Sequence, residues 1–143
     1  VSNANFGTPQ RNVNGFDFKR LAMLLAVLEK RIGTHMGTKD VFINLVGGLK
    51  IDDPAADLAV ISAVASSSRD KLIKESVVLI GEVGLGGEVR SVSRLKERIN
   101  EAKSLGFKSV IAPAANLKRM KDRIKGVDII GVTNVGEVFH HLF

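Results

Sequence analysis

The stretch IDDPAADLAV at residues 51–60 has the features of a helix start that could support catalysis. Asp53 provides a carboxylate that can cap a helix, and Pro54 follows at the first helical position, where proline is favoured. The free N–H groups and positive dipole end of such a helix could stabilise an oxyanion or activate a nucleophile. The next residues, however, are Ala55 and Ala56. The sequence therefore predicts a helix start that is suited to catalysis but carries no nucleophilic side chain.

A second arrangement with catalytic potential is formed by Ser93 and Lys96, which match an S-x-x-K pattern. In this pattern a lysine on the same helix can take the proton of a serine. The penicillin-binding enzymes that use it also carry S-D-N and K-T-G elements, and neither element occurs in this sequence. Ser93 is therefore predicted to be the N-cap of a helix.

Neither the glycines nor the histidines form a recognisable binding motif. The segment GEVGLGGEV at residues 81–89 lacks the GxGxxG spacing and the Lys-Ser or Lys-Thr pair of phosphate-binding loops, so it predicts a tight turn between strands. His140 and His141 are adjacent and His35 stands alone, which is too few ligands for a metal site. The sequence contains no cysteine, and this excludes disulfides and thiolate metal sites within the chain.

The positive charge is concentrated in one part of the chain. The net charge is +6, and residues 94–125 contain ten Lys and Arg against three Asp and Glu. These ten are Arg94, Lys96, Arg98, Lys103, Lys108, Lys118, Arg119, Lys121, Arg123 and Lys125. The distribution indicates either an anionic partner or a solvated basic face. Because the chain has no Trp or Tyr, a platform that stacks single-stranded bases would have to use its seven Phe.

Length and residue pattern predict one α/β domain with a mixed sheet and flanking helices. Residues 1–16 are rich in Asn and Gly and are predicted to be an irregular lead-in, with the domain over 17–143. Helices are expected at residues 17–32, 54–67, 93–105, 114–124 and 134–142. Strands are expected at 41–48, 77–83, 109–113 and 127–132, with a short returning strand near 89. Strand and helix alternate in the second half, which favours partly parallel pairing there.

Four segments in order resemble the C-terminal Lon-protease-like domain of the bacterial RadA (Sms) family of DNA repair proteins. They are FGTPQR (6–11), FDFKRLAMLLAVLEKR (16–31), DVFINLVGGLKIDDPAADLAV (40–60) and GEVGLGGEVRSVSRLKERINEAKSLGF (81–107). The resemblance covers essentially the whole chain. It implies the fold of Lon protease domains, which is of the ribosomal protein S5 domain 2-like type.

The resemblance also accounts for the alanines after Pro54. In active Lon-type proteases the corresponding helix start reads D-G-P-S-A-G, and its serine is the nucleophile. By this resemblance Ala55 stands at the nucleophile position, Asp57 at the following glycine, and Lys96 at the general base. A methyl group cannot attack a carbonyl, and Asp53 and Asp57 would oppose a developing oxyanion, so a pseudoprotease is expected. Lys96 is expected to pair with Asp53 or Asp57.

The family role implied by the resemblance is DNA repair and recombination after DNA damage. Members resemble DNA-dependent ATPases that form hexameric rings and process branched recombination intermediates, with this domain as non-catalytic scaffold and DNA-binding module. No cofactor is expected in these residues, because ATP, Mg and Zn belong to a RecA-like ATPase domain and a zinc-binding segment. The chain is thus expected to be a fragment that also lacks the first strand of the family domain. Expected partners are single-stranded or branched duplex DNA, further copies of the chain and the recombinase RecA, in the bacterial cytoplasm and without a membrane.

The candidate DNA-binding residues form two basic groups. They are Arg94, Arg98, Lys103, Lys118, Arg119, Lys121, Arg123 and Lys125. Two alternatives remain open at this point. One is an active Ser-Lys peptidase of the Lon type that uses another serine, such as Ser62 or one of Ser66–Ser68. The other is a domain for oligomerisation only, without DNA contact.

Overall fold

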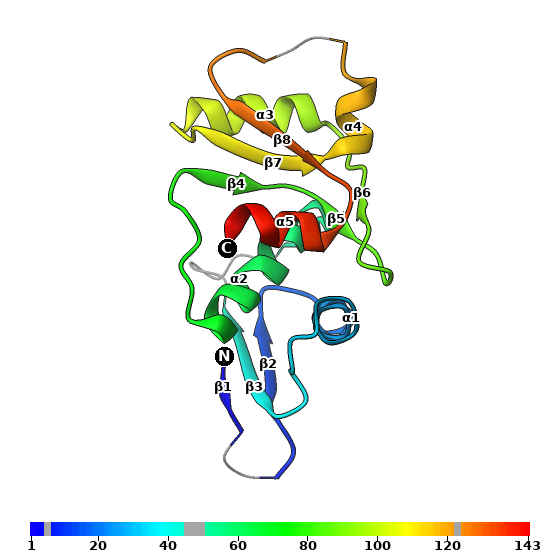
Figure 1. Cartoon of the computed structure of the whole chain (residues 1–143), viewed down its shortest axis with the longest axis vertical. Coiled ribbons are helices and arrows are strands. Elements are labelled where there is room, and N and C mark those ends of the chain that lie inside the picture. The colour runs from blue at the N-terminus through cyan, green and yellow to red at the C-terminus, as the bar shows by residue number, and fades with distance from the viewer. Residues whose placement is uncertain (5–6, 45–50, 122–123) are drawn as a thin grey trace.

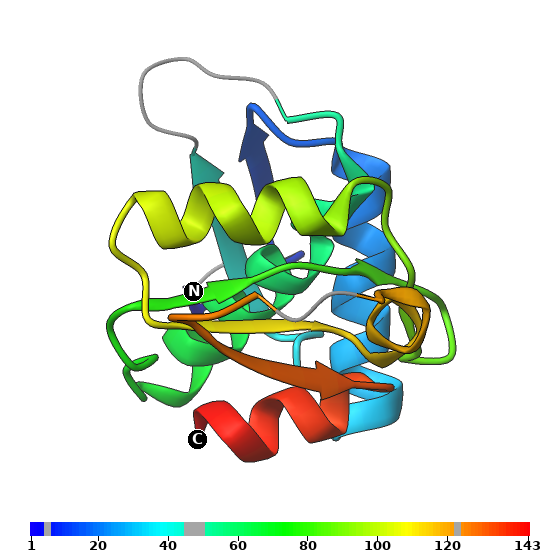
Figure 2. The same ribbon diagram turned by 90° about the horizontal axis from the view of Figure 1, so that it is seen from above.

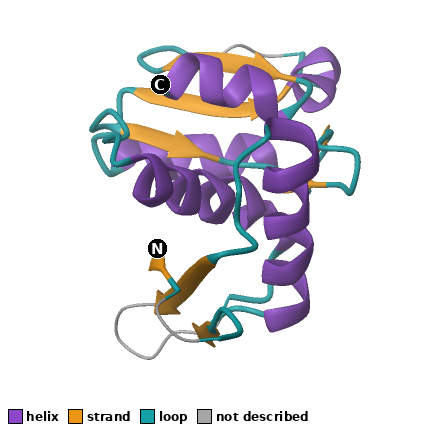
Figure 3. Ribbon diagram, turned by 60° about the horizontal axis from the view of Figure 1, so that its bottom comes forward, coloured by secondary structure: helices purple, strands orange, loops and turns teal. Residues whose placement is uncertain are grey.

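The computed structural model describes residues 1–4, 7–44, 51–121 and 124–143. The strands in these ranges form two three-stranded sheets and a two-stranded hairpin, and this confirms the predicted α/β class. Figures 1 and 3 show the two larger sheets at opposite ends of the molecule, with α2 between them. None of the described helices is long and apolar enough to cross a membrane.

The N-terminal sheet has the order β1-β3-β2, with β1 at Ser2–Asn3, β2 at Arg11–Asn14 and β3 at Lys39–Asn44. β1 runs antiparallel and β2 parallel to β3. The expectation that residues 1–16 are irregular was therefore wrong for β1 and β2. The segment has little apolar periodicity, and its strands form because β3 supplies backbone partners. The expected strand at 41–48 begins earlier, and residues 45–48 lie outside the described ranges.

The first helix follows the predicted pattern closely. α1 spans Phe18–Val27 and continues through a π-helical turn at Leu28–Ile32. Asp17 caps it by accepting a hydrogen bond from the Lys19 N–H at 2.8 Å. Gly33 ends it with a φ of 78°, a left-handed conformation that glycine adopts without steric cost.

The second helix begins with a 3₁₀ turn. Asp53 precedes the turn Pro54–Ala56, and α2 spans Asp57–Arg69. The apolar side of α2 packs with α1 in the main core, where Leu21, Leu24 and Leu58 are fully buried or nearly so. This packing fixes the position of the helix start on which the candidate site depends.

The C-terminal sheet is parallel throughout, and because the hairpin beside it is antiparallel, the second half is partly parallel as the alternation of strands and helices predicted. Its order is β4-β7-β8, with β4 at Val77–Leu79, β7 at Ser109–Pro113 and β8 at Asp128–Val132. The glycine-rich segment forms the predicted turn between β5 at Glu82–Val83 and β6 at Val89–Arg90, which pair antiparallel. The predicted strand 77–83 is therefore divided into β4 and β5.

Two helices cover opposite faces of this sheet (Figure 2). α3 spans Leu95–Ser104 and α5 spans Val135–Leu142. Adjacent residues of β7 alternate between the two sides, because Val110 packs in the cluster of α3 and Ile111 in the main core with α5. α4, at Ala114–Arg119, follows β7 and is shorter than the predicted helix 114–124, since Met120 already has an extended backbone.

The prediction that Ser93 caps α3 was wrong. The residue before the helix is Arg94, which has a φ of 58° and makes no side-chain cap. The Ser93 carbonyl accepts a hydrogen bond from Arg98 Nε at 2.8 Å. Burial of Leu95 on the sheet fixes where the helix begins, and this tertiary contact overrides the local preference of serine for a cap.

Candidate functional site

The start of α2 uses its backbone N–H groups within the protein. The Ala55 N–H donates to the Asp53 carboxylate at 3.0 Å, and the Ala56 N–H donates to the Asp53 carbonyl at 3.0 Å. The Leu58 N–H donates to the Gly81 carbonyl at 3.0 Å, and the Gly81 N–H donates to the Ala55 carbonyl at 2.9 Å. Donors that could stabilise an oxyanion at this corner are thus already bonded.

Ala55 itself is a packing residue. It is only 6% exposed and belongs to an apolar cluster with Ile80, Leu95 and Ile99. The position that the resemblance assigns to a nucleophile is therefore occupied by a methyl group that contacts aliphatic side chains. A methyl group offers neither a lone pair nor a proton for acyl transfer.

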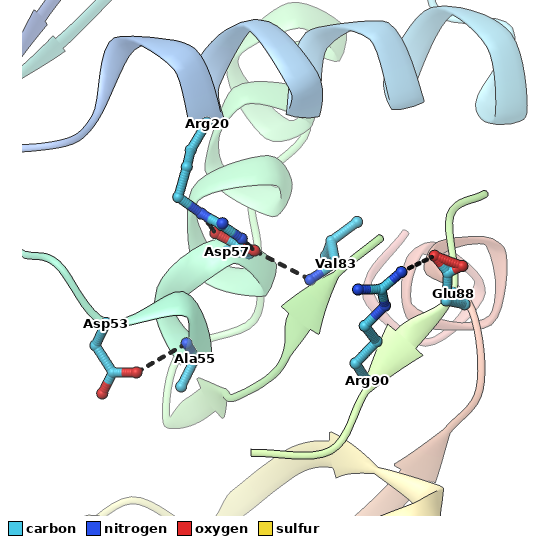
Figure 4. Close-up of polar contacts among 7 residues, drawn as sticks. All are labelled: Arg20, Asp53, Ala55, Asp57, Val83, Glu88 and Arg90. Carbon is cyan, nitrogen blue, oxygen red and sulfur yellow. Dashed lines mark hydrogen bonds and ion pairs between the residues drawn. The ribbon is translucent and has the colours of Figure 1, made fainter. Parts of the chain in front are cut away.

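Asp57 is completely buried and joins three elements (Figure 4). Its carboxylate accepts hydrogen bonds from Arg20 Nε at 2.9 Å, from Arg20 Nη2, and from the Val83 N–H at 3.1 Å. This carboxylate raises the pKa of Arg20 above its usual value, chiefly through the side-chain hydrogen bond. Asp57 thus ties α1, α2 and β5 together, which is a structural task that glycine could not perform.

Asp53 has a second partner besides the helix start. Its other carboxylate oxygen lies 2.7 Å from Arg98 Nη1. The Ala55 N–H and then Arg98 lower the pKa of Asp53, because both favour the charged form. The expected pairing of Lys96 with Asp53 or Asp57 was wrong, because arginines form the ion pairs of both carboxylates. Lys96 lies exposed on the first turn of α3.

The serines proposed as alternative nucleophiles are placed away from the start of α2. Ser62 is fully buried within α2, and among the described residues its Oγ has no hydrogen-bond partner. Ser66 donates its hydroxyl to the Lys71 carbonyl, and the Ser67 hydroxyl accepts from the Val1 amino group at 3.0 Å. A nucleophilic serine needs a base within hydrogen-bond reach, and neither Ser62, without a partner among the described residues, nor Ser66, bonded to a backbone carbonyl, has one.

The candidate DNA-binding residues lie in two places. Arg94 precedes α3, which carries Arg98 and Lys103, whereas Lys118 and Arg119 form the last turn of α4 and Lys121 lies just beyond. Lys125 precedes β8, and Arg123 lies outside the described residues. All the described candidates except Arg98 are exposed.

The fold brings Lys103, at the end of α3, next to the loop that contains Lys125 and Gly126. The Lys103 side chain crosses Gly126, where an added Cβ would lie 3.0 Å from its Cε. Lys103 and Lys108 border an open depression of about 550 Å³ that Asp128 also lines. This depression lies at the amino ends of β7 and β8, whereas Lys118 and Arg119 follow the carboxyl end of β7. The basic segment therefore forms two surfaces rather than one.

The fold and the start of α2 are those of a Lon-type protease domain. The family of the Lon protease (S16) C-terminal proteolytic domain matches residues 27–143, and the chain belongs to this family. The Lon-like fold predicted from the four segments is thereby confirmed.

The particular relatives are DNA repair proteins. The chain is 47% identical over 137 residues to DNA repair protein RadA of Bacillus subtilis (strain 168) and 44% identical over 138 residues to DNA repair protein RadA of Streptococcus pyogenes serotype M1. Each alignment covers 96% of this chain and 30% of the relative. The predicted resemblance to RadA is confirmed, and the chain spans less than a third of the length of these relatives.

Proposed function

We propose that this chain is the non-catalytic Lon-like domain of a RadA-type DNA repair and recombination ATPase. In that role it contacts DNA and contributes to a homo-hexameric ring that processes branched recombination intermediates. The structure at the start of α2 is the observation that supports the absence of protease activity. Ala55 is buried at the nucleophile position, the neighbouring N–H groups are bonded, and Asp57 is held by Arg20.

The proposed DNA contact rests on the exposed basic residues in the last turn of α4 and just after it, Lys118, Arg119 and Lys121. Phosphate contacts by Lys and Arg do not depend on sequence, and they release counterions, so affinity falls as salt rises. If about four side chains touch phosphates, log K should fall with log salt at a slope of about −3.6. A single domain of this kind should bind in the non-specific range of about 10⁻⁴ to 10⁻⁶ M, and a ring would raise the apparent affinity by avidity.

A triple charge reversal tests the contact. Lys118→Glu, Arg119→Glu and Lys121→Glu are combined, and binding to a fluorescein-labelled branched DNA duplex is followed by anisotropy over a range of salt. Loss of binding with a smaller salt slope supports the contact, provided that circular dichroism and light scattering show an unchanged fold and oligomer.

The matched control reverses the charges of three exposed lysines elsewhere on the molecule. Lys30, Lys71 and Lys74 are exposed and lie outside the basic segment, so their combined change to Glu alters the net charge equally. Equal weakening by both triple variants would show that only net charge matters. Unchanged binding by the first variant would refute the contact at α4.

The proposed assembly is tested by light scattering with and without duplex DNA. We expect weak self-association of this chain that increases with concentration, because an ATPase domain would supply much of the ring interface. A strictly monomeric chain at high concentration would assign the ring interface to the ATPase instead. ATP, Mg and Zn sites, contact with the recombinase RecA and a cytoplasmic location belong to the same proposal for the whole protein.

A further inference from the structure

The depression of about 550 Å³ that Lys103 and Lys108 border lies between the end of α3 and the amino ends of β7 and β8. Its apolar part is formed by Phe107 and Val127, which are half-buried and pack against the cluster of α3. Figure 1 shows α4 at the other end of these strands, and β1 with the N-terminus in the other sheet. The depression is therefore distinct from the basic residues of α4 and distant from β1.

Two glycine turns allow a ligand to approach the backbone closely at this depression. Gly106 and Gly126 have φ values of 91° and 87°, a conformation that glycine adopts without steric cost. At Gly106, no described atom outside its chain neighbours lies within 4 Å of an added Cβ. At Gly126, the stem of Lys103 takes that place, and its Nζ lies 3.3 Å from an added Cβ. An extended chain can therefore lie against bare backbone at Gly106, with the Lys103 ammonium held beside the second turn.

Backbone hydrogen bonds hold the charged residues of the depression in place. The Lys108 N–H donates to the Ser76 carbonyl at 3.1 Å, and the Asp128 N–H donates to the Lys108 carbonyl at 2.9 Å. At the end of α3, the Gly106 N–H donates to the Lys103 carbonyl at 3.0 Å. The depression is thus formed before a partner binds, and this reduces the entropy cost of binding.

The charged side chains of the depression are available to a ligand. Lys103, Lys108 and Asp128 are exposed, and within the described part of the chain none of them forms an ion pair. Lys125, which precedes Gly126, is also exposed. Three ammonium groups around one carboxylate favour an occupant with several negative charges. Asp128 nevertheless opposes a continuous polyanion such as duplex DNA, which carries one charge per about 1.7 Å of its axis.

We propose that this depression binds an acidic segment of a partner protein. Carboxylates of the segment meet the ammonium groups of Lys103 and Lys108, and an apolar side chain between them covers Phe107 and Val127. An amide N–H of the segment donates to Asp128. A polypeptide combines carboxylates, apolar side chains and amide donors within a few residues, whereas a nucleic acid backbone offers only the negative charge. Because this surface is separate from α4, the proposal goes beyond the DNA contact and does not depend on it.

Three capped peptides test the proposal by NMR titration. The first has a central phenylalanine with three glutamates on each side, the second has glutamine in place of every glutamate, and the third has alanine in place of the phenylalanine. We expect the first peptide to bind and to shift the amide signals of residues 106–108 and 126–128. The second should bind at least about tenfold more weakly, a factor that corresponds to about 1.4 kcal/mol, and the third should also bind more weakly than the first.

A double variant of the protein provides the complementary test. Lys103→Gln with Lys108→Gln removes two ammonium groups and keeps most of the stem that crosses Gly126, so affinity for the first peptide should fall at least about tenfold. The matched control is Lys19→Gln with Lys30→Gln, because both lysines are exposed on α1 and its π-helical turn, away from the depression. If circular dichroism shows that the double variant has an altered fold, the comparison of the three peptides on the unaltered chain still decides the proposal.

Five results would overturn it. They are no shift of these amides at the highest soluble concentration of the first peptide, equal affinity for the first two peptides, equal weakening by the two double variants, shifts of the same amides by a DNA duplex at a lower concentration than by the peptide, and shifts of these amides when the protein alone is concentrated. The third would show that only net charge matters. The fourth would assign the depression to nucleic acid, and the fifth would assign it to a second copy of the chain.

Discussion

Replacing Asp57 with alanine removes the carboxylate that joins α1, α2 and β5. The variant leaves two groups without their acceptor, the Arg20 guanidinium and the Val83 N–H. Arg20 is 29% exposed and can turn toward water, whereas the Val83 N–H donates to a carboxylate that is fully buried. The part of the loss that comes from the ion pair should therefore be smaller than for a completely buried pair but well above that of a surface pair.

The magnitude follows from these two contributions. Breaking a buried pair costs about 3–5 kcal/mol, and the exposure of Arg20 reduces this to about 2 kcal/mol. An N–H left without an acceptor adds about 1–3 kcal/mol. The expected loss in the free energy of unfolding is thus about 3–5 kcal/mol. With a urea dependence of about 2 kcal/mol per M, the unfolding midpoint should fall by about 2 M.

Urea unfolding followed by far-UV circular dichroism measures the effect, because the chain has no Trp or Tyr for fluorescence. Asp52→Ala is the matched control, since Asp52 is exposed in the same segment and its loss should change stability by less than about 0.5 kcal/mol. A midpoint for Asp57→Ala within about 0.5 M of the unaltered chain would refute the role assigned to this carboxylate.

Three further outcomes follow from the start of α2. Ala55→Ser should not hydrolyse casein or a fluorogenic peptide, because the neighbouring donors are already bonded; robust turnover would show that only the nucleophile was missing. The lowered pKa of Asp53 stabilises the fold above its ordinary value of about 3.9, and this contribution is lost as pH falls through the lowered value. Asp53→Asn keeps a capping oxygen but cannot titrate, so its unfolding midpoint should fall less than that of the unaltered chain below about pH 4; parallel midpoint curves would contradict the assignment. Gly81→Ala should cost about 1–3 kcal/mol in a urea titration, because its Cβ would lie 2.8 Å from Val89 Cγ1; an unchanged midpoint would show that this side chain can move aside.

Local sequence signals predicted the elements whose limits depend on nearby residues. The strand at 109–113 matches β7, a short apolar run with glycine and basic residues before it. The helix at 134–142 matches α5, because Asn134 accepts a hydrogen bond from the Glu137 N–H at 2.9 Å as an N-cap. These features need no information from distant parts of the chain.

The partners in the candidate site depend on contacts that are distant in sequence. Arg20 and Asp57 are 37 positions apart, and Arg98 and Asp53 are 45 apart, so neither pair has a local pattern. The sequence therefore identified the acidic residues at the start of α2 but assigned Lys96 as their partner. The position of β4 at one end of the described C-terminal sheet could not be predicted for the same reason, since it depends on the order of strands in the sheet.

The ion pair of Arg20 and Asp57 also restricts how the sequence can evolve. Adopting the D-G-P-S-A-G pattern requires glycine at position 53, serine at position 55 and glycine at position 57. The change at position 57 would leave Arg20 and the Val83 N–H without their acceptor, and natural domains tolerate only a few kcal/mol of such loss. A lineage regaining the protease pattern must therefore change Arg20 as well, or pass through a poorly folded intermediate. The buried carboxylate thus couples position 57 to Arg20 and Val83, so that every later substitution that relies on this ion pair makes a change at position 57 more destabilising.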